Sequence, residues 1–203
     1  MLQLESALST SQKLKIDENK LGNPQFVLEF LKSNGFYETH ITKLVEKHPP
    51  LLVCRVESNL KPKLEYLAQI GYRGTFLPEL IISNPYIVRA SLCRMIKPCF
   101  EFLKEKLVSI EGRNDLVIKG LKRSSWLFTS NLDKILKPNF DLLVKGGVPV
   151  SNITTSLLFK CVLTQKPDSC IRSFNAVKGL GIDPKSPAFV YALRVMAQLS
   201  EST

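Results

Sequence analysis

The sequence predicts an all-α, helical-repeat solenoid built from two-helix units, each closed by a short turn. A Leu-Lys-Pro or Ile-Lys-Pro unit occurs at residues 60–62, 96–98 and 136–138, so that successive prolines lie 36 and 40 residues apart. A period in this range is typical of stacked repeat arrays. In such an array each unit buries its apolar face only against its neighbours.

Three further rows of residues keep this spacing. They are apolar pairs after the proline site (30–31, 66–67, 102–103 and 142–143), glycines (Gly35, Gly71 and Gly147) and mainly apolar runs (49–52, 85–88, 125–128 and 161–164). Leu107 stands at the glycine position of the third unit, whose extra residues fall within 107–124. The rows predict an array over 23–203, with units of about 23–59, 60–95, 96–135, 136–171 and a partial unit over 172–203. Residues 1–22 are expected to form a partial repeat or a flexible segment.

The first helix of each unit is expected to begin near the proline, as in the second unit. Ser58 and Asn59 are suited to cap the helix, and Pro62 falls where the first helical turn tolerates a missing N–H. Apolar residues then recur at helical spacing. Gly71 ends the helix, because glycine adopts the left-handed C-cap conformation at little cost.

The second helix of each unit follows the glycine after a short turn. In the second unit its apolar face is expected over 76–81, and it ends at Asn84, because the residue before Pro85 is pushed out of the helical region. The apolar residues 86–88 are expected to form a short turn that plugs the base of the unit. The fourth unit repeats this pattern, with residues 151–152 as caps of a helix that includes residues 153, 157 and 158.

The positive charge of the chain is concentrated in its middle and later units. Lys and Arg total 28 against 18 Asp and Glu, which gives a formal net charge of +10. Residues 1–50 hold six basic and six acidic side chains, whereas residues 89–178 hold sixteen basic and seven acidic ones. Such a local excess of cations is typical of proteins that bind polyanions, because each phosphate they neutralise releases condensed counterions.

Repeat-equivalent positions single out the cations that are expected to bind. Lys61, Lys97 and Lys137 precede the three prolines, and Arg94 and Lys134 share a second position. Equivalent positions in a solenoid form rows along one edge, so these cations are suited to follow a phosphate backbone. For each of these residues the alternative is a solvated side chain at a helix start that has no role in binding. The expected nucleic-acid-binding residues are Lys61, Arg89, Arg94, Lys97, Lys122, Arg123, Lys134 and Lys137.

Several other classes of protein are disfavoured by the sequence. It contains no Gly-rich phosphate loop and no Gly-x-Ser-x-Gly motif, so we expect no enzyme, no cofactor and no small-molecule substrate. The five cysteines form no Cys-x-x-Cys pair, and only two histidines accompany them, which disfavours a metal site or a disulfide framework. No apolar run approaches the roughly 20 residues that span a bilayer. We expect no membrane partner.

Several segments together resemble one known family. They are residues 23–24, 30–36, 48–52, 60–67, 83–88, 145–149 and 189–194. In spacing, prolines and glycines they are similar to the mitochondrial transcription termination factor (mTERF) repeat proteins, particularly the land-plant branch. The resemblance runs from about residue 20 to the C-terminus. It implies a curved superhelix that binds nucleic acid on its concave side, in mitochondria or chloroplasts, and acts on organelle transcription or RNA maturation.

Both ends of the chain depart from the usual pattern of that family. Residues 1–19 contain three acidic side chains and no arginine, unlike an Arg-rich transit peptide. The chain also stops soon after an incomplete fifth unit, where plant members usually carry further repeats. From this we expect a fragment, a short isoform or an incomplete gene model.

The leading hypothesis is a monomeric protein that binds double-stranded DNA and regulates organellar transcription, including its termination. Contacts to the nucleic-acid backbone would dominate, with some readout of bases. One alternative is an RNA-binding factor in organelle RNA maturation. Another is an all-helical scaffold whose groove takes a peptide or an acidic protein, and a third is a product that folds poorly and does little. A nucleic-acid binder should line its groove with Lys and Arg, whereas a peptide binder should line it with apolar and mixed residues.

Overall fold

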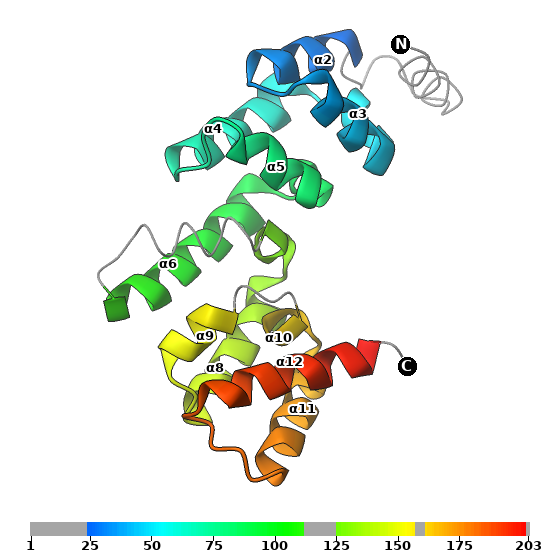
Figure 1. The fold of residues 1–203 in the computed structure, drawn as a ribbon. Coiled ribbons are helices and arrows are strands. Elements are labelled where there is room, and N and C mark those ends of the chain that lie inside the picture. The colour runs from blue at the N-terminus through cyan, green and yellow to red at the C-terminus, as the bar shows by residue number, and fades with distance from the viewer. Residues whose placement is uncertain (1–23, 112–124, 157–160, 202–203) are drawn as a thin grey trace. The chain divides into compact units, whose positions relative to one another are not determined.

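The computed structural model describes residues 24–111, 125–156 and 161–201 (Figure 1). All regular structure in these residues is helical, which confirms the predicted all-α, helical-repeat fold class. The chain divides into two compact units, Met1–Leu92 and Cys93–Thr203. The expectation for residues 1–22 lies outside the described residues, and the repeat boundaries stay predictions.

The first compact unit contains two repeats. Its elements are α2 (Pro24–Ser33), α3 (Glu38–Lys47), η1 (Pro49–Val53), η2 (Val56–Leu60), α4 (Lys61–Gln69), α5 (Phe76–Ser83) and η3 (Pro85–Val88). Helix α3 packs on α5, the second helix of the next repeat, and α2 packs on the closing turn η1. The predicted order of helix, turn, helix and closing turn is therefore observed in both repeats.

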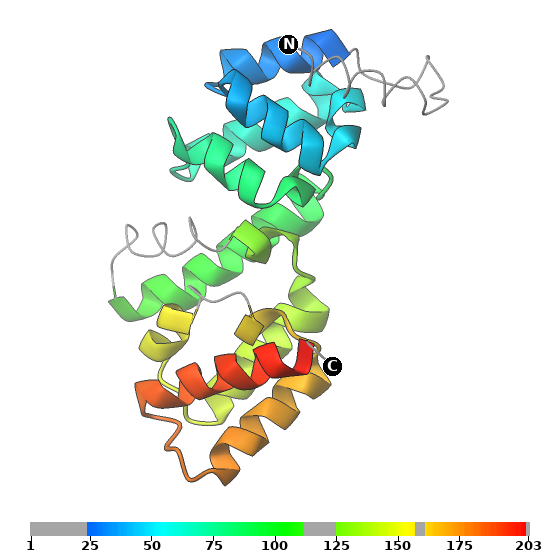
Figure 2. The same ribbon diagram turned by 45° about the vertical axis from the view of Figure 1, so that its right-hand side comes forward.

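The second compact unit contains the later repeats (Figure 2). Its elements are α6 (Lys97–Glu111), η5 (Ser125–Thr129), η6 (Leu132–Leu136), α8 (Lys137–Lys145), α9 (Val150–Ser156), α10 (Cys161–Thr164), α11 (Pro167–Gly179) and α12 (Pro187–Glu201), and the turn η4 (Leu92–Ile96) precedes them. First helices pack on first helices, as α8 does on α11, and second helices on second helices, as α9 does on α12. Both helices of the fourth repeat thus pack on the corresponding helices of the next repeat.

The closing turns are deeply buried. Two consecutive apolar side chains in each are no more than 2% exposed: Leu51 and Leu52, Ile87 and Val88, Leu127 and Phe128, and Val162 and Leu163. This confirms that these runs plug the base of their repeats. Tyr86 is an exception to the prediction, because it precedes the buried pair of its turn and is 64% exposed.

Glycines with positive φ end the first helices. Gly35, Gly71 and Gly147 have φ angles of 82°, 106° and 88°, which is the left-handed region that glycine adopts without strain. Gly181, with φ 75°, plays the same role after α11. Gly181 was not predicted from the repeat, because it lies 34 residues after Gly147, two short of the usual period.

The prolines lie in the first turn of the α-helices, as the sequence predicted: Pro62 and Pro138 are the second residues of α4 and α8. The π turn that precedes each of these helices was not predicted. In the second repeat the chain is helical from Val56, and the N–H groups of Leu60 and Lys61 donate five residues back, to Arg55 and Val56. The wider π turn accommodates Pro62, which has no N–H and whose ring would crowd the carbonyl four residues earlier. The same π turns, η4 and η6, precede the other two Lys-Pro pairs.

The predicted helix caps, in contrast, are wrong. No side chain caps α4, and the Asn59 side chain accepts a hydrogen bond from Lys63 instead. In the fourth repeat α9 already begins at Val150, so Ser151 and Asn152 lie inside it. The Asn152 side chain donates to the Lys185 carbonyl of the following turn, at 3.1 Å. Residues 157 and 158 of that prediction lie outside the described residues.

Candidate nucleic-acid interface

The structure places most of the expected cations at the starts of the first helices. Lys61, Lys97 and Lys137 are the first residues of α4, α6 and α8, and Arg94 and Lys134 lie in the π turns η4 and η6. Their side chains are exposed or half-exposed, as is that of Arg89, which follows η3. Lys122 and Arg123 lie outside the described residues.

Two of these lysines form ion pairs within their own helical turn. The Lys61 ammonium lies 2.8 Å from the Glu57 carboxylate, and the Lys137 ammonium lies 2.7 Å from the Asp133 carboxylate, four residues earlier in each case. The hydrogen bond with Glu57 raises the pKa of Lys61. Exposed pairs of this kind are weak. They nevertheless lower the net charge that these repeat starts offer to a phosphate.

The third repeat replaces the acidic partner with a thiol. Exposed Cys93 stands four residues before Lys97, where Glu57 and Asp133 stand before their lysines. The turn η4 therefore contributes Arg94 and no carboxylate. The nearest acidic residue along the chain is Glu101, one turn into α6.

The three repeat starts differ in net charge for this reason. From the first residue of the π turn to the lysine before proline, the second repeat carries one acid and one base, which cancel. The fourth carries one acid and two bases, a net charge of +1, and the third carries two bases alone, a net charge of +2. Within these six residues the third repeat therefore carries the largest excess of positive charge of the three.

Arg89 lies near a buried histidine that terminates α3. His48 is only 6% exposed, its ring centroid lies 6.1 Å from that of Tyr86, and Nε2 has no hydrogen-bond partner among the described residues. Burial, and secondarily the charge of Arg89, lowers the pKa of His48. His48 therefore favours the neutral form.

The residue after each proline has a structural role that was not predicted from the sequence. Lys63 is 5% exposed, and its ammonium donates to the Val88 carbonyl and to the Asn59 side chain. Burial lowers the pKa of Lys63. This lysine ties the first helix of the second repeat to its closing turn, so it is no part of a binding surface.

In the third and fourth repeats, other side chains at the same position connect the first helix to the closing region. The Cys99 thiol lies 3.5 Å from the Ser130 carbonyl, and burial raises its pKa to about 11, which keeps it a protonated donor. The Asn139 amide donates to the carbonyls of Leu163 and Gln165, at 3.0 and 2.8 Å. The sequence did contain a sign of this role, because a polar residue stands at a position that helical spacing places in the core.

One aromatic residue assigned to the core lies on the surface instead. Phe76 was expected on the buried face of its helix, but it is 49% exposed, and Tyr37 at the start of α3 is 65% exposed. Phe76 is the first residue of α5, so it precedes the buried positions that begin at Leu77.

No metal or membrane feature is found in the described parts of the chain. They contain no group of three or more His, Cys, Asp or Glu that could hold a metal ion. None of the helices they form is long and apolar enough to cross a bilayer. The four cysteines whose side chains are described, Cys54, Cys93, Cys99 and Cys170, are free thiols.

These features define an all-helical repeat protein whose repeat starts carry exposed cations. The chain belongs to the mTERF family, because the family's sequence model matches residues 28–202. It is similar to the transcription termination factor MTERF2, chloroplastic, of Arabidopsis thaliana, with 24% identity over 122 residues. The match covers 60% of this chain and 18% of that relative, so the chain spans only part of the relative's length.

Proposed function

We propose that this protein binds double-stranded DNA as a monomer, through the cations at its repeat starts, and regulates transcription in a plant organelle, including its termination. Its membership of the mTERF family supports a role with nucleic acid. The name of its chloroplastic relative supports a role in transcription and an organellar location, in a chloroplast or a mitochondrion.

The charge of the third repeat start is the observation that carries this proposal. Arg94 and Lys97 lie one helical turn apart without a carboxylate in their π turn, and Lys134 and Lys137 occupy the equivalent positions one repeat later. Phosphates along a duplex are regularly spaced, so cations that recur with the repeat suit backbone contacts. Such contacts position a protein on DNA without reading its sequence.

The salt dependence of duplex binding tests the proposal. Log affinity falls against log salt with a slope of about −0.9 for each phosphate contact, so replacing four contacting cations should reduce the slope by about 3.6. The variant carries alanine at Arg94, Lys97, Lys134 and Lys137. A control with the same change in net charge carries alanine at four other exposed lysines: Lys104, Lys145, Lys166 and Lys178. Equal slopes for the two variants would contradict the proposed interface.

The scaffold alternative has one observation in its favour. Tyr191, Val195 and Leu199 follow one another at intervals of four along α12, and each is more than half exposed. An apolar stripe on a basic protein suits an acidic, amphipathic partner helix. An acidic protein titrated beside the duplex distinguishes the two functions, because binding that is strong only to that protein favours the scaffold.

A further inference from the structure

The carboxylates that pair with Lys61 and Lys137 are more exposed than the lysines themselves. The Glu57 side chain is 67% exposed against 44% for Lys61, and the Asp133 side chain is 79% exposed against 44% for Lys137. A phosphate that approaches either ammonium from solvent therefore meets a negative charge beside it. The ion pair has to open, or the repulsion of the carboxylate has to be overcome, before the lysine neutralises the phosphate.

The acid before the lysine is the feature that varies among the repeat starts. An acid also follows each of the three lysines by four residues: Glu65, Glu101 and Asp141. The structure nevertheless pairs Lys61 and Lys137 with the acid four residues before them. That order is the more favourable one on a helix, because it suits the helix dipole. The third repeat has Cys93 at this position, where the other two have an acid.

We propose that Glu57 and Asp133 restrain the affinity of the protein for nucleic acid, because they compete with phosphates for Lys61 and Lys137. This restraint rests on the proposed function, since it acts on the same phosphate contacts. Such contacts supply essentially all of the binding that is independent of sequence. The two acids therefore hasten dissociation from DNA of any sequence, and the affinity that remains depends more on other contacts.

An acid beside a phosphate-binding lysine can have the opposite role. It can position the ammonium in the geometry that a phosphate needs, as a hydrogen-bond partner orients a ligand. The two roles predict opposite results when the negative charge is removed. Loss of a restraint strengthens binding to nucleic acid, whereas loss of a positioning partner weakens it.

The test removes both carboxylates and keeps the size of the side chains, in the variant Glu57→Gln with Asp133→Asn of the full chain. Both acids are exposed, and exposed ion pairs contribute little to stability. We therefore expect an unchanged circular-dichroism spectrum and melting temperature. The probe is duplex DNA of mixed sequence, titrated at several salt concentrations between about 50 and about 200 mM.

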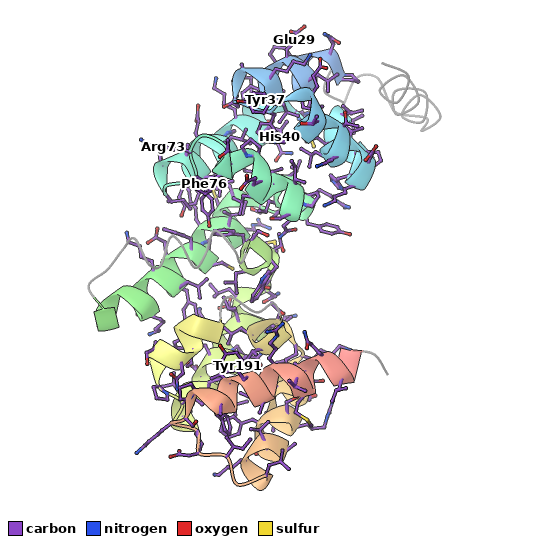
Figure 3. All side chains as sticks on the ribbon, in the orientation of Figure 1. Glu29, Tyr37, His40, Arg73, Phe76 and Tyr191 are labelled. Carbon is purple, nitrogen blue, oxygen red and sulfur yellow. The ribbon has the colours of Figure 1, made fainter. Side chains whose placement is uncertain are left out.

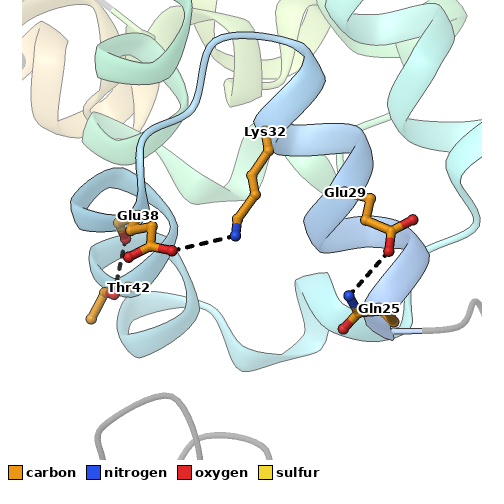
Figure 4. Close-up of polar contacts among 5 residues, drawn as sticks. All are labelled: Gln25, Glu29, Lys32, Glu38 and Thr42. Atoms are coloured by element: carbon orange, nitrogen blue, oxygen red, sulfur yellow. Dashed lines mark hydrogen bonds and ion pairs between the residues drawn. The ribbon is translucent and has the colours of Figure 1, made fainter. Parts of the chain in front are cut away.

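The matched control is Glu29→Gln with Glu38→Gln, which changes the net charge by the same amount outside the π turns. Glu29 lies on α2 (Figure 3) and accepts a hydrogen bond from the Gln25 side chain at 3.1 Å. Glu38 begins α3 and pairs with the Lys32 ammonium at 3.4 Å (Figure 4). The control thus also removes two exposed acids, one of them ion-paired.

We expect the variant without Glu57 and Asp133 carboxylates to bind the duplex about fourfold or more tightly than wild type at about 50 mM salt, which is about twofold or more for each freed lysine. The gain should shrink as salt rises, so the slope of log affinity against log salt should steepen by up to about 0.9 for each lysine. The control should gain clearly less. Unchanged or weaker binding, or an equal gain in the control, would overturn the proposal.

A second measurement shows whether the acid acts through its lysine. Glu57→Gln is compared in wild type and in a Lys61→Met background, where no ammonium remains to be freed. We expect most of the gain in affinity to disappear in that background. A gain that persists in full would show that Glu57 repels the DNA without competing for Lys61, and would overturn the proposed competition.

Failure of the restraint can be told apart from failure of the proposed function. Equal salt slopes for the alanine variant at Arg94, Lys97, Lys134 and Lys137 and for its control would overturn the interface, and the restraint with it. A reduced slope in that alanine variant, with no gain in Glu57→Gln with Asp133→Asn, would retain the interface and overturn the restraint alone.

Discussion

The second and third repeats begin with the same backbone and with different charge. Both enter their first helix through a π turn that precedes a Lys-Pro pair. Glu57 neutralises Lys61 in the second repeat, whereas Cys93 leaves the third repeat start with two cations and no acid in its turn. The backbone depends on the proline and the buried apolar residues, so exposed positions of the turn vary in charge without affecting the fold.

The largest expected effect comes from breaking the shared backbone. Leu103 is fully buried within α6, so Leu103→Pro removes both a helical hydrogen bond and a core side chain. It should lower the free energy of unfolding by about 3 kcal/mol or more. Pro98→Ala, which only relaxes a proline that the π turn already accommodates, should change it by about 1 kcal/mol or less. Thermal melts compare the two, and equal losses would show that the helix register is wrong.

A smaller loss is expected from the polar tie that is particular to the second repeat. Lys63→Met keeps the length of the side chain but leaves the Val88 carbonyl and the Asn59 side chain without their donor. We expect a loss of about 1–3 kcal/mol in the free energy of unfolding, measured by denaturant titration. Lys61→Met, two residues earlier at an exposed position, is the control and should have little effect. Similar losses in both variants would argue against a structural role for Lys63.

The two closing turns of the first compact unit should differ in their response to acid. His48 and Asn84 both precede the proline of a closing turn and both are buried, but only His48 titrates. Because its folded-state pKa is lowered, His48 contributes full stability above about pH 6.5 and loses it as the pH falls through the folded-state pKa. His48→Asn should therefore reduce the loss of melting temperature between about pH 7.5 and about pH 5.5. An identical pH profile in wild type and variant would contradict this.

The smallest effect should come from giving the third repeat the charge pattern of the second. Cys93→Glu places a carboxylate four residues before Lys97, as Glu57 stands before Lys61. If Lys97 contacts one phosphate, the salt-dependence slope of duplex binding should fall by up to about 0.9. Cys93→Ser controls for loss of the thiol. A slope that is the same in both variants would show that Lys97 does not contact the nucleic acid.

Residue spacing was sufficient to predict the helices, the glycine turns and the closing turns. Buried pairs such as Leu127 and Phe128 follow from the repeat, because a position that is apolar in every copy has to face the core. The exposed cations Arg94 and Lys97 were likewise found from register. Whether they contact DNA stays a prediction.

Other features depend on tertiary partners that no local pattern specifies. The sequence alone suggests a solvated Lys63, because the Val88 carbonyl that accepts its hydrogen bond lies 25 residues later in the chain. The apolar pattern places Phe76 in the core, but α5 begins at Phe76, one residue before its buried face. The π turns were not predicted, because a proline near the start of an α-helix has the same sequence pattern whether or not a π turn precedes it.

The glycine turns differ in length from repeat to repeat. Two residues separate Gly35 from the start of α3, whereas five separate Gly181 from the start of α12. Both turns still deliver a second helix that packs on its neighbour. The segment between Gly181 and Pro187 therefore accommodates a change of length, but a peptide tag inserted there for protein engineering has to spare Lys185, whose carbonyl accepts a hydrogen bond from Asn152 of α9.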